Sequence, residues 1–552
     1  MLHPFPNFSD PQRVADERYD TLRSCQKLKK SGAVIEPGMD LRIADALFSR
    51  EMGYVDLVLA AVTLLHANPR VVSILDLAWQ KDEQALDALL ADGTLVAFLN
   101  TPLIQALLYS SPIPDLAMER LLTHVRRRLL ACAIDQTWRS DTFTMSAVAA
   151  LSAHSFLTEY VFEETQTESD LVTNLQNRLE SHSAADIDPF DLVLLGCYRA
   201  LGDLESAQKI EDALIVNSDS ILKALWRIQV SEPEHERHLQ GGIQRISEIN
   251  DATSRAVRSL YEENPYPRWV CYPRNNPKPP QTVLSEWYGG VDLEAFGAPN
   301  SVDILVAGCG TGQAAILEAA MWRDSTVYAV DLSLASLSYG QRCAEEIGLS
   351  SIEFVQGDIL ELSSMDRKFD YISCVGVLHH MADPLAGWTV LSNACRPGGV
   401  MLIGLYGEIM RKSIAAGSSF LKGFTAGNTP EAIRKARQTL IDHAHESGER
   451  DETYNSIFNT FDFYDLSMCR DLLFHVQEVD FSIPMIESAL KQLGLKFCGF
   501  SGVGDDAIQK YRTFAPHDLM GTDLASWEEF EIQNPELFKG MYNFIVQKPV
   551  AS

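Results

Sequence analysis

The stretch Val302-Asp303-Ile304-Leu305-Val306-Ala307-Gly308-Cys309-Gly310-Thr311-Gly312 decides the fold predicted for this chain. Its first half contains a short apolar run, residues 304–307, which is typical of a buried parallel strand. Its second half has glycine at alternate positions, and a missing Cβ lets the backbone turn sharply and come close to a ligand. Residues 313–321 have the pattern of a helix. We therefore expect a ligand at the N-terminus of that helix.

The spacing of the glycines distinguishes two classes of cofactor. A dinucleotide fingerprint has the form G-x-G-x-x-G, but Gln313 stands where its third glycine would be. The observed form, G-x-G-x-G, resembles motif I of the class I methyltransferases that depend on S-adenosylmethionine (SAM). An ordinary strand-to-helix turn also uses such glycines, so the segments that follow decide between these interpretations.

Four further apolar strands follow the glycine-rich segment in order. The first, residues 327–331, ends in Asp331, and a carboxylate at the tip of such a strand can accept both hydroxyls of a ribose. The next, residues 352–359, ends in a Gly-Asp pair that contains Asp358. The last two are residues 369–376 and 400–404. Strands that alternate with helices at this spacing along the chain predict a parallel, doubly wound sheet.

These five ordered segments make residues 250–552 resemble the class I SAM-dependent methyltransferases. The resemblance implies a Rossmann-like α/β domain with S-adenosyl-L-methionine as its cofactor. In the resembled family, the aspartate of the third strand faces the adenine amino group. The cofactor-binding residues that the resemblance implies are Gly308, Cys309, Gly310, Gly312, Asp331, Asp358 and Ile359.

One position departs from the family pattern. Val306 lies two residues before the first glycine, where most members carry Asp or Glu to help hold the methionine amino group. Residues 263–269, Glu-Asn-Pro-Tyr-Pro-Arg-Trp, contain two prolines that fix the backbone. We expect this turn to close over the methionine end of the cofactor, with a polar contact from Tyr266 or Asn264 and a carboxylate pair from Arg268. The alternative is a rigid connector with an aromatic anchor.

Candidate catalytic residues follow the fourth and fifth predicted strands. His379 and His380 come directly after the fourth strand, where a His-His pair is common in the resembled family. Adjacent histidines can also indicate a metal, but no further ligand has a useful spacing, so no metal site is predicted. Tyr406 follows the fifth strand and is the second candidate catalytic residue.

An insertion, residues 407–480, separates the fifth strand from the rest of the sheet. An insertion at this point of a doubly wound sheet lies over the edge where ligands bind, so we expect a substrate lid. The pattern predicts a last helix over residues 469–478 with Asp471, His475 and Glu478 on one face. His475 is the third candidate catalytic residue, as a base oriented by the two carboxylates. A polar exposed face is the alternative.

The chain divides into three predicted parts. Residues 1–245 show apolar side chains at helical spacing and predict an all-helical domain. Residues 192–207 loosely resemble a tetratricopeptide helix pair, although no clean repeat precedes them. Residues 246–300 are predicted to form the cap segment and a Pro-rich linker. Residues 301–552 are the predicted methyltransferase domain, closed by an antiparallel pair of strands near its end.

Composition excludes several classes of protein. No apolar run of the 552 residues reaches the ~20 needed to span a bilayer, and the N-terminus does not have the pattern of a secretory signal. The 10 cysteines contain no C-x-x-C pair. We therefore expect a cytoplasmic protein with no membrane contact. The formal net charge of −29 opposes a nucleic-acid partner and favours a basic one, or simply solubility.

Three functions remain open at this point. The first is methyl transfer to a heteroatom of a protein or peptide side chain, with the helical half docking that substrate. The second is methyl transfer to a small metabolite, where the helical half forms a homodimer or shields the site. The third is a SAM-binding scaffold without turnover. We expect the first, because the helical half is large and the chain is acidic.

Overall fold

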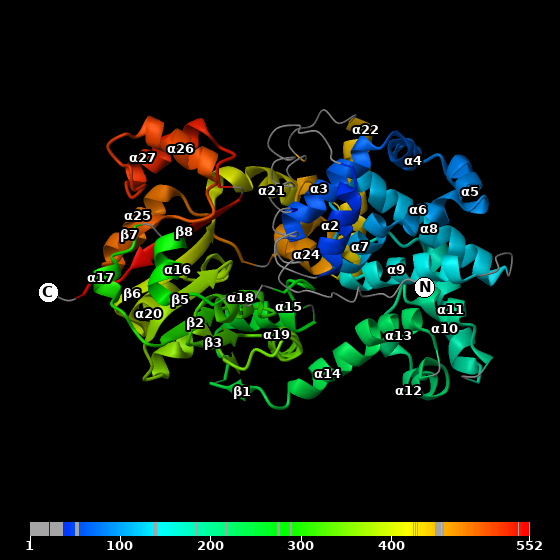
Figure 1. Cartoon of the computed structure of the whole chain (residues 1–552), viewed down its shortest axis with the longest axis horizontal. Coiled ribbons are helices and arrows are strands. Elements are labelled where there is room, and N and C mark those ends of the chain that lie inside the picture. The colour runs from blue at the N-terminus through cyan, green and yellow to red at the C-terminus, as the bar shows by residue number, and fades with distance from the viewer. Residues whose placement is uncertain are drawn as a thin grey trace. The chain divides into compact units, whose positions relative to one another are not determined.

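The computed structural model describes residues 21, 37–49, 54–135, 141–183, 186–216, 218–246, 248–263, 265–272, 277–287, 290–422, 424, 427, 429–447, 454, 457–475, 477–538 and 540–550. Its chain forms two compact units (Figure 1). The helical unit comprises Met1–His235, Arg268–Tyr272 and Gly417–Phe474. The sheet unit comprises Glu236–Pro267, Pro273–Ala416 and His475–Ser552.

The sheet unit is built on an eight-stranded sheet with the order β1-β4-β3-β2-β5-β6-β8-β7. The strands are β1 (Gln244–Arg245), β2 (Val302–Ala307), β3 (Ser325–Asp331), β4 (Ile352–Gln356), β5 (Phe369–Val375), β6 (Cys395–Tyr406), β7 (Lys496–Phe500) and β8 (Met541–Gln547). Strands β1 to β6 are parallel, and β8 is antiparallel to both β6 and β7. The predicted Rossmann-like sheet and its antiparallel closing pair are confirmed. The short strand β1 was not predicted.

Helices connect the strands of the sheet unit and cover both of its faces (Figure 1). The helical segments assigned wholly to this unit are α15 (Ala252–Glu263), α16 (Pro280–Trp287), α17 (Leu293–Phe296), α18 (Gln313–Met321), α19 (Leu334–Glu346), η5 (Ile359–Ser364), η6 (Leu378–His380), α20 (Pro384–Ala394), α25 (Ile483–Leu493), α26 (Asp505–Phe514) and α27 (Leu524–Gln533). Two more helices, α14 (Glu232–Leu239) and α21 (Glu408–Leu421), cross the boundaries between the units.

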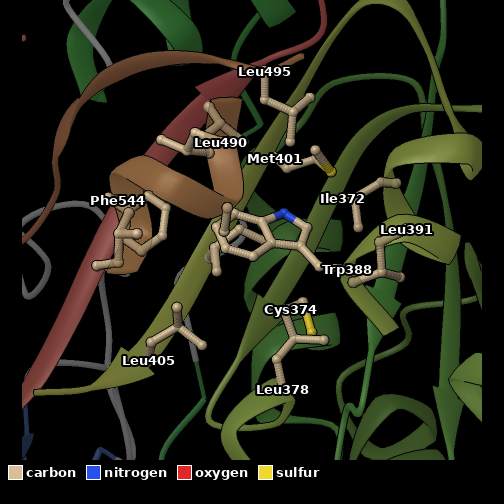
Figure 2. Packing of buried hydrophobic residues seen from close by; sticks show 14 of the residues in the cluster. Ile372, Cys374, Leu378, Trp388, Leu391, Met401, Leu405, Leu490, Leu495 and Phe544 are labelled. Atoms are coloured by element: carbon tan, nitrogen blue, oxygen red, sulfur yellow. The ribbon is translucent and has the colours of Figure 1, made fainter. Parts of the chain in front are cut away.

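A hydrophobic core of the sheet unit packs α20 and α25 against the sheet (Figure 2). Trp388 of α20 is only 1% exposed and packs among strand residues such as Ile372 and Met401. On the opposite face, Trp322 meets Tyr371 of β5 with ring centroids 4.9 Å apart. Each fully buried large apolar side chain contributes about 1.5–3 kcal/mol. The strand ends that carry the candidate site are thus fixed from both faces.

The helical unit contains only helical segments and the turns between them in its described residues. Its helices are α2 (Met39–Phe48), α3 (Tyr54–Ala67), α4 (Pro69–Trp79), α5 (Glu83–Ala91), α6 (Thr94–Leu99), α7 (Pro102–Ser110), α8 (Leu116–Ile134), α9 (Thr142–Leu157), α10 (Gln166–Ser181), α11 (Pro189–Leu195), η2 (Leu201–Asp203), α12 (Ala207–Ile210), η3 (Glu211–Ile215), α13 (Ser220–Trp226), η4 (Arg227–Ser231), α22 (Pro430–Ser447), η7 (Phe461–Tyr464) and α24 (Leu466–Phe474). The predicted helical character agrees with this arrangement, whereas the tetratricopeptide-like pattern stays a prediction.

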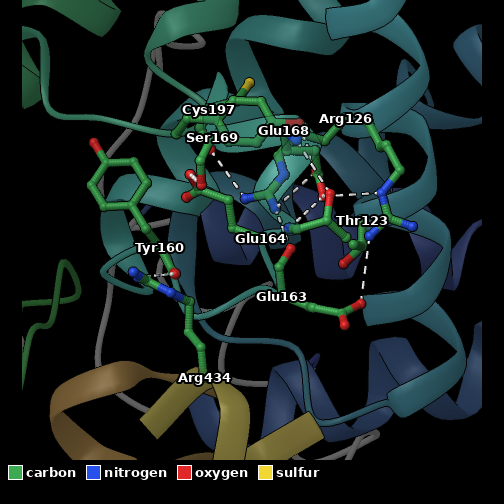
Figure 3. A network of polar contacts seen from close by, with 12 residues as sticks. Thr123, Arg126, Tyr160, Glu163, Glu164, Glu168, Ser169, Cys197 and Arg434 are labelled. Carbon is green, nitrogen blue, oxygen red and sulfur yellow. Dashed lines mark hydrogen bonds and ion pairs between the residues drawn. The ribbon is translucent and has the colours of Figure 1, made fainter. Parts of the chain in front are cut away.

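Buried ion pairs hold the helical unit together. Arg437 of α22 donates to both carboxylate oxygens of Glu119 on α8, at 3.0 and 2.9 Å. A second network joins α8, α10 and the turn before α10, where Arg126 lies beside Glu168, and Arg434 donates to the Tyr160 carbonyl (Figure 3). Removing one partner of a buried pair typically costs about 3–5 kcal/mol, because the other charge stays buried. These pairs attach the late segment Gly417–Phe474 to the N-terminal helices.

The grouping of Gly417–Phe474 with the helical unit bears on the predicted lid. The sequence placed residues 407–480 in the methyltransferase domain, whereas most of this insertion packs with the N-terminal helices. A substrate-covering role for it stays a prediction. Among the described residues, no single helix is long and apolar enough to cross a membrane. One pair of consecutive helices, Val55–Ala67 and Pro69–Trp79, meets the criterion only together and is bent by 93°.

The predicted helix over residues 469–478 is wrong in its second half. Helix α24 ends at Phe474, so His475 and Glu478 lie outside it. Beyond the helix, Glu478 accepts hydrogen bonds from Arg411, and the backbone N–H of Val479 donates to the His379 carbonyl at 2.9 Å. These tertiary bonds outweigh the local helical spacing.

Glu318 of α18 should make the stability of the sheet unit depend on pH. Its side chain is 4% exposed, and burial raises its pKa from the ordinary 4.5 to about 7, although hydrogen bonds from Trp322 and Tyr371 oppose the rise. The folded chain therefore keeps this proton up to about pH 7, whereas the unfolded chain releases it near 4.5. The stabilisation of the folded state by this bound proton is complete below pH 4.5 and is lost as the pH rises through 7.

Replacing this carboxyl with an amide should remove that dependence. We expect Glu318→Gln to raise the free energy of unfolding at pH 8 by about 3 kcal/mol and to leave it little changed at pH 4.5. Urea denaturation at both pH values measures the difference. The exposed Glu294→Gln is the control and should have the same effect at both. Equal effects of Glu318→Gln at the two pH values would contradict the assignment.

Candidate functional site

The glycine-rich loop between β2 and α18 is shaped by the protein's own atoms. Gly308 and Gly310 have φ of 73° and 51°, in the left-handed region that favours glycine. A Cβ on Gly308 would lie 2.4 Å from Val377 Cγ2, and a Cβ on Gly310 would lie 2.7 Å from the Tyr266 carbonyl oxygen. The sequence attributed these glycines to a close ligand. The structure adds that the loop must also admit neighbouring parts of the sheet unit.

Asp331 at the end of β3 is joined directly to this loop. One carboxylate oxygen accepts the Gly310 N–H at 2.8 Å, and the other accepts the Ser333 N–H at 2.9 Å. Burial raises the pKa of this carboxyl, and the backbone hydrogen bonds oppose the rise. Each carboxylate oxygen can accept a second bond. Asp331 thus fits the two hydroxyls of a ribose next to the glycine loop.

The end of β4 offers a second buried carboxylate. Asp358 accepts the Leu360 N–H at 3.0 Å and caps η5, which begins at Ile359. Its carboxylate retains acceptor capacity for an amino group. The thiol of Cys309 is buried beside Asp331, and desolvation raises its pKa well above the ordinary range. Cys309 therefore stays a neutral thiol, and its backbone N–H donates to the Val330 carbonyl at 2.9 Å.

Residues 261–263 and 265–267, here called the strap, bind two of the loops that carry predicted cofactor residues. At one end, the Tyr266 carbonyl accepts the Thr311 N–H at 3.3 Å, and the Pro267 carbonyl accepts the Thr311 hydroxyl. At the other end, the Tyr261 carbonyl accepts the Ser333 hydroxyl at 3.0 Å. The strap therefore connects the glycine loop with the turn after β3. Asn264 lies outside the described residues.

The side chains of the predicted cap have other neighbours in the structure. The Tyr266 ring stacks on Tyr261 with centroids 6.0 Å apart. Arg268 belongs to the helical unit, where its Nε donates to Glu159 at 2.8 Å. Val306 is buried within β2, as its apolar side chain requires. Cofactor contacts from Tyr266 and Arg268 stay predictions, and a cofactor carboxylate would compete with Glu159 for the guanidinium.

His379, Tyr406 and Arg411 form a stack at the carboxyl ends of β5 and β6. His379 is fully buried, and its ring lies 3.9 Å from the Tyr406 ring at an interplanar angle of 26°. The Arg411 guanidinium lies 3.8 Å from the centroid of the same ring. Two planar groups this close to one ring must occupy its opposite faces. The predicted catalytic residues His379 and Tyr406 are thus in direct contact.

Arg411 was not identified from the sequence. It donates three hydrogen bonds to the Glu478 carboxylate, with donor–acceptor distances of 2.5 to 2.8 Å. The only local signal is a charged residue after two apolar ones, and such a pattern has many causes. Its partner lies 67 positions away, and no periodicity connects the two residues.

The hydrogen bond to His379 fixes its tautomer. The Tyr406 N–H donates to His379 Nδ1 at 3.2 Å, so Nδ1 carries the lone pair and Nε2 carries the proton. Nε2 is buried and has no hydrogen-bond partner among the described residues. Burial lowers the pKa of His379 well below its ordinary 6.5, and the charges of His380, Arg411 and His475 lower it further. His379 is therefore neutral at pH 7.

The third predicted catalytic residue, His475, contacts the neighbouring imidazole. Its ring stacks on His380 with centroids 3.6 Å apart. His475 Nδ1 accepts the Gln477 N–H at 3.1 Å, and His380 Nδ1 donates to the Gln477 carbonyl at 3.0 Å. His379 and His380 are 4.3 Å apart between ring centroids. The structure therefore gathers all three predicted catalytic residues into one cluster of imidazole and phenol rings.

Comparisons with known proteins relate this chain to methyltransferases. Residues 304–399 match the model of a methyltransferase domain. An uncharacterized protein of Synechococcus sp. is 27% identical over 302 residues, which cover 52% of this chain and 70% of that protein. The ubiquinone biosynthesis O-methyltransferase of Leptothrix cholodnii is 26% identical over 169 residues, which cover 28% of this chain and 70% of that enzyme.

The structure of PKMT2 from Rickettsia typhi in complex with AdoHcy has a TM-score of 0.38 and 17% identity to this chain. The match covers 52% of this chain and 55% of the other, so this chain spans about half the length of that protein. The match over residues 304–399 supports a class I methyltransferase domain within the sheet unit, and its cofactor is SAM.

The ribose assignment of Asp331 predicts a loss of cofactor affinity. Asp331→Ala should weaken SAM binding by about 1.5–3 kcal/mol, the range for hydrogen bonds to a charged group. Isothermal titration with SAM and with S-adenosylhomocysteine measures the loss. Far-UV circular dichroism checks that the sheet still forms. Unchanged affinity in a folded variant would show that the ribose binds elsewhere.

The close approach at Gly310 predicts a second loss of SAM affinity, which backbone strain alone would not produce. Gly310→Ala should displace the strap and weaken SAM binding at least about tenfold, or about 1.4 kcal/mol, because its Cβ would meet the Tyr266 carbonyl. Gly348→Ala is the matched control, since Gly348 also has a positive φ, 70°, but no atom within 4 Å of the added Cβ. Equal SAM affinity in the two variants would contradict the strap's role.

Proposed function

We propose that this chain transfers the methyl group of SAM to a heteroatom of a protein or peptide side chain. The observation that carries the methyl transfer is the joined pair of loops, in which Asp331 binds the Gly310 N–H within the segment that matches a methyltransferase domain. The peptide substrate is supported by a large helical unit with its own buried network. Helical-repeat surfaces commonly bind peptides, and residues 192–207 of this unit are predicted to resemble such a repeat.

The chain's contribution to this reaction is position and the exclusion of water. When bound, SAM supplies an electrophilic methyl group on a sulfonium. Asp331 orients the ribose, Asp358 receives the adenine amino group, and the strap covers the glycine loop. Holding the acceptor in line with the methyl group lowers the barrier without covalent chemistry from the protein.

A second candidate is methyl transfer to a small metabolite. It is favoured by the His379–His380 pair and by relatives named as ubiquinone biosynthesis O-methyltransferases, whose similarity covers 20–31% of this chain. In this alternative the helical unit would shield the site or form a homodimer. Both candidates use the same cofactor residues and differ only in what approaches the cluster of rings.

A labelling experiment separates the candidates. Purified chain is incubated with SAM tritiated at the methyl group and either dialysed cell lysate or a small-molecule extract. We expect the label in protein, and we expect Asp331→Ala to reduce it. Label only in the extract would favour the metabolite alternative. SAM binding without transfer to either fraction would identify a scaffold without turnover.

A further inference from the structure

His379 holds a proton that it does not share with any described residue. Its Nε2 is buried without a partner, while its Nδ1 is engaged by the Tyr406 N–H at 3.2 Å. A buried donor without a partner typically costs about 1–3 kcal/mol. Such groups in a folded protein call for an explanation. Val377, two residues earlier, packs at the glycine loop, so this donor lies on the segment that borders the cofactor site.

A general base is a poor description of this imidazole. A base needs a lone pair directed at the proton that it removes, and the lone pair of His379 is bound by the backbone. Protonation would place a charge in a fully buried position beside Arg411 and two further imidazoles. The Tyr406 ring and the Arg411–Glu478 pair fix the ring in this orientation.

We propose that His379 donates its Nε2–H to an anionic oxygen of the methyl acceptor, so that the acceptor is a carboxylate or a similar oxygen acid. This inference rests on the proposed methyl transfer. A carboxylate is already ionised at neutral pH, whereas a lysine amine arrives protonated. An ammonium group has only N–H donors, so it could not accept the hydrogen bond from His379 Nε2. An oxygen anion makes a short, charge-assisted hydrogen bond there.

The transfer balances without a base. One carboxylate oxygen accepts the His379 hydrogen bond, and a lone pair of the carboxylate forms the bond to the methyl carbon. The carbon–sulfur bond breaks, and its electron pair stays on sulfur. The carboxylate becomes a neutral ester and the sulfonium becomes a neutral thioether. No proton is transferred, so His379 acts by holding the acceptor in line.

The charged and titratable groups around His379 come from several elements. His380 lies on the same segment, Arg411 on α21, and His475 and Glu478 on the segment after α24. Glu478 offsets the charge of Arg411 through three hydrogen bonds. Within this group, His379 Nε2–H is a buried donor without a hydrogen-bond partner among the described residues.

Imidazole variants distinguish a donor from a base. His379→Gln places an amide N–H near the position of Nε2, whereas His379→Phe keeps the ring without a donor. We expect kcat/KM for methylation of the labelled protein pool to stay within about tenfold of the wild-type value in His379→Gln. In His379→Phe we expect kcat/KM to fall about 10–100-fold. His517→Gln, which changes an exposed imidazole, is the control and should have no effect. Equal losses in the Gln and Phe variants would overturn the proposal.

Nuclear magnetic resonance tests the same inference without turnover. Protein labelled with ¹⁵N-histidine and saturated with S-adenosylhomocysteine should show His379 as the neutral Nε2–H tautomer from pH 5.5 to 8, assigned by its absence in His379→Gln. Adding benzoate should shift the Nε2 signal, and benzylamine should not. A tautomer with the proton on Nδ1, titration within this range, a response to benzylamine, or no response to benzoate would each overturn the proposal.

If neither cell fraction is methylated but benzoate still shifts the Nε2 signal, the proposed methyl transfer fails while the recognition of an anionic oxygen stands. If methylation occurs without a benzoate response, the methyl transfer stands and the assignment of the acceptor fails.

Discussion

The hydrogen bond from the Gly310 N–H to the Asp331 carboxylate connects the two strand ends on which the site depends. Strands β2 and β3 are parallel neighbours, so their carboxyl ends meet at one edge of the sheet. The carboxylate satisfies backbone donors of both loops and thereby sets their separation. The strap then binds Thr311 on one side and Ser333 on the other. A parallel sheet alone would bring these loops near each other without fixing their atoms.

A second constraint is the burial of charge. Arg437 is 1% exposed, and the Glu119 carboxylate, two backbone carbonyls and the face of the Phe463 ring offset its desolvation. In the sheet unit, Arg411 is buried beside Tyr406 and depends on Glu478 in the same way. A buried guanidinium needs several aligned acceptors. Each pair therefore fixes a segment that the sequence leaves far from its partner.

Local patterns carried much of the prediction. The strands were found because a buried parallel strand is a short apolar run, and Asp331 and Asp358 because each ends such a run. Strand β1 was missed because two residues, Gln244–Arg245, show no apolar pattern and pair with β4 only in the folded sheet. The end of α24 was misplaced because helical spacing continues to Glu478, whereas the bond to Arg411 draws that residue away.

The sequence by itself determined the class of sheet, the positions of its predicted strands along the chain, the glycine loop and the carboxylates at the strand ends. Each of these leaves a local pattern in the sequence, such as a short apolar run, closely spaced glycines or an aspartate at the end of a run. The tertiary structure alone decided the state of His379. Its tautomer depends on the Tyr406 N–H, 27 positions away, and its neutrality depends on burial among groups from three segments. Burial and long-range hydrogen bonds leave no period in a sequence, so the tautomer and charge of His379 could not be predicted from it.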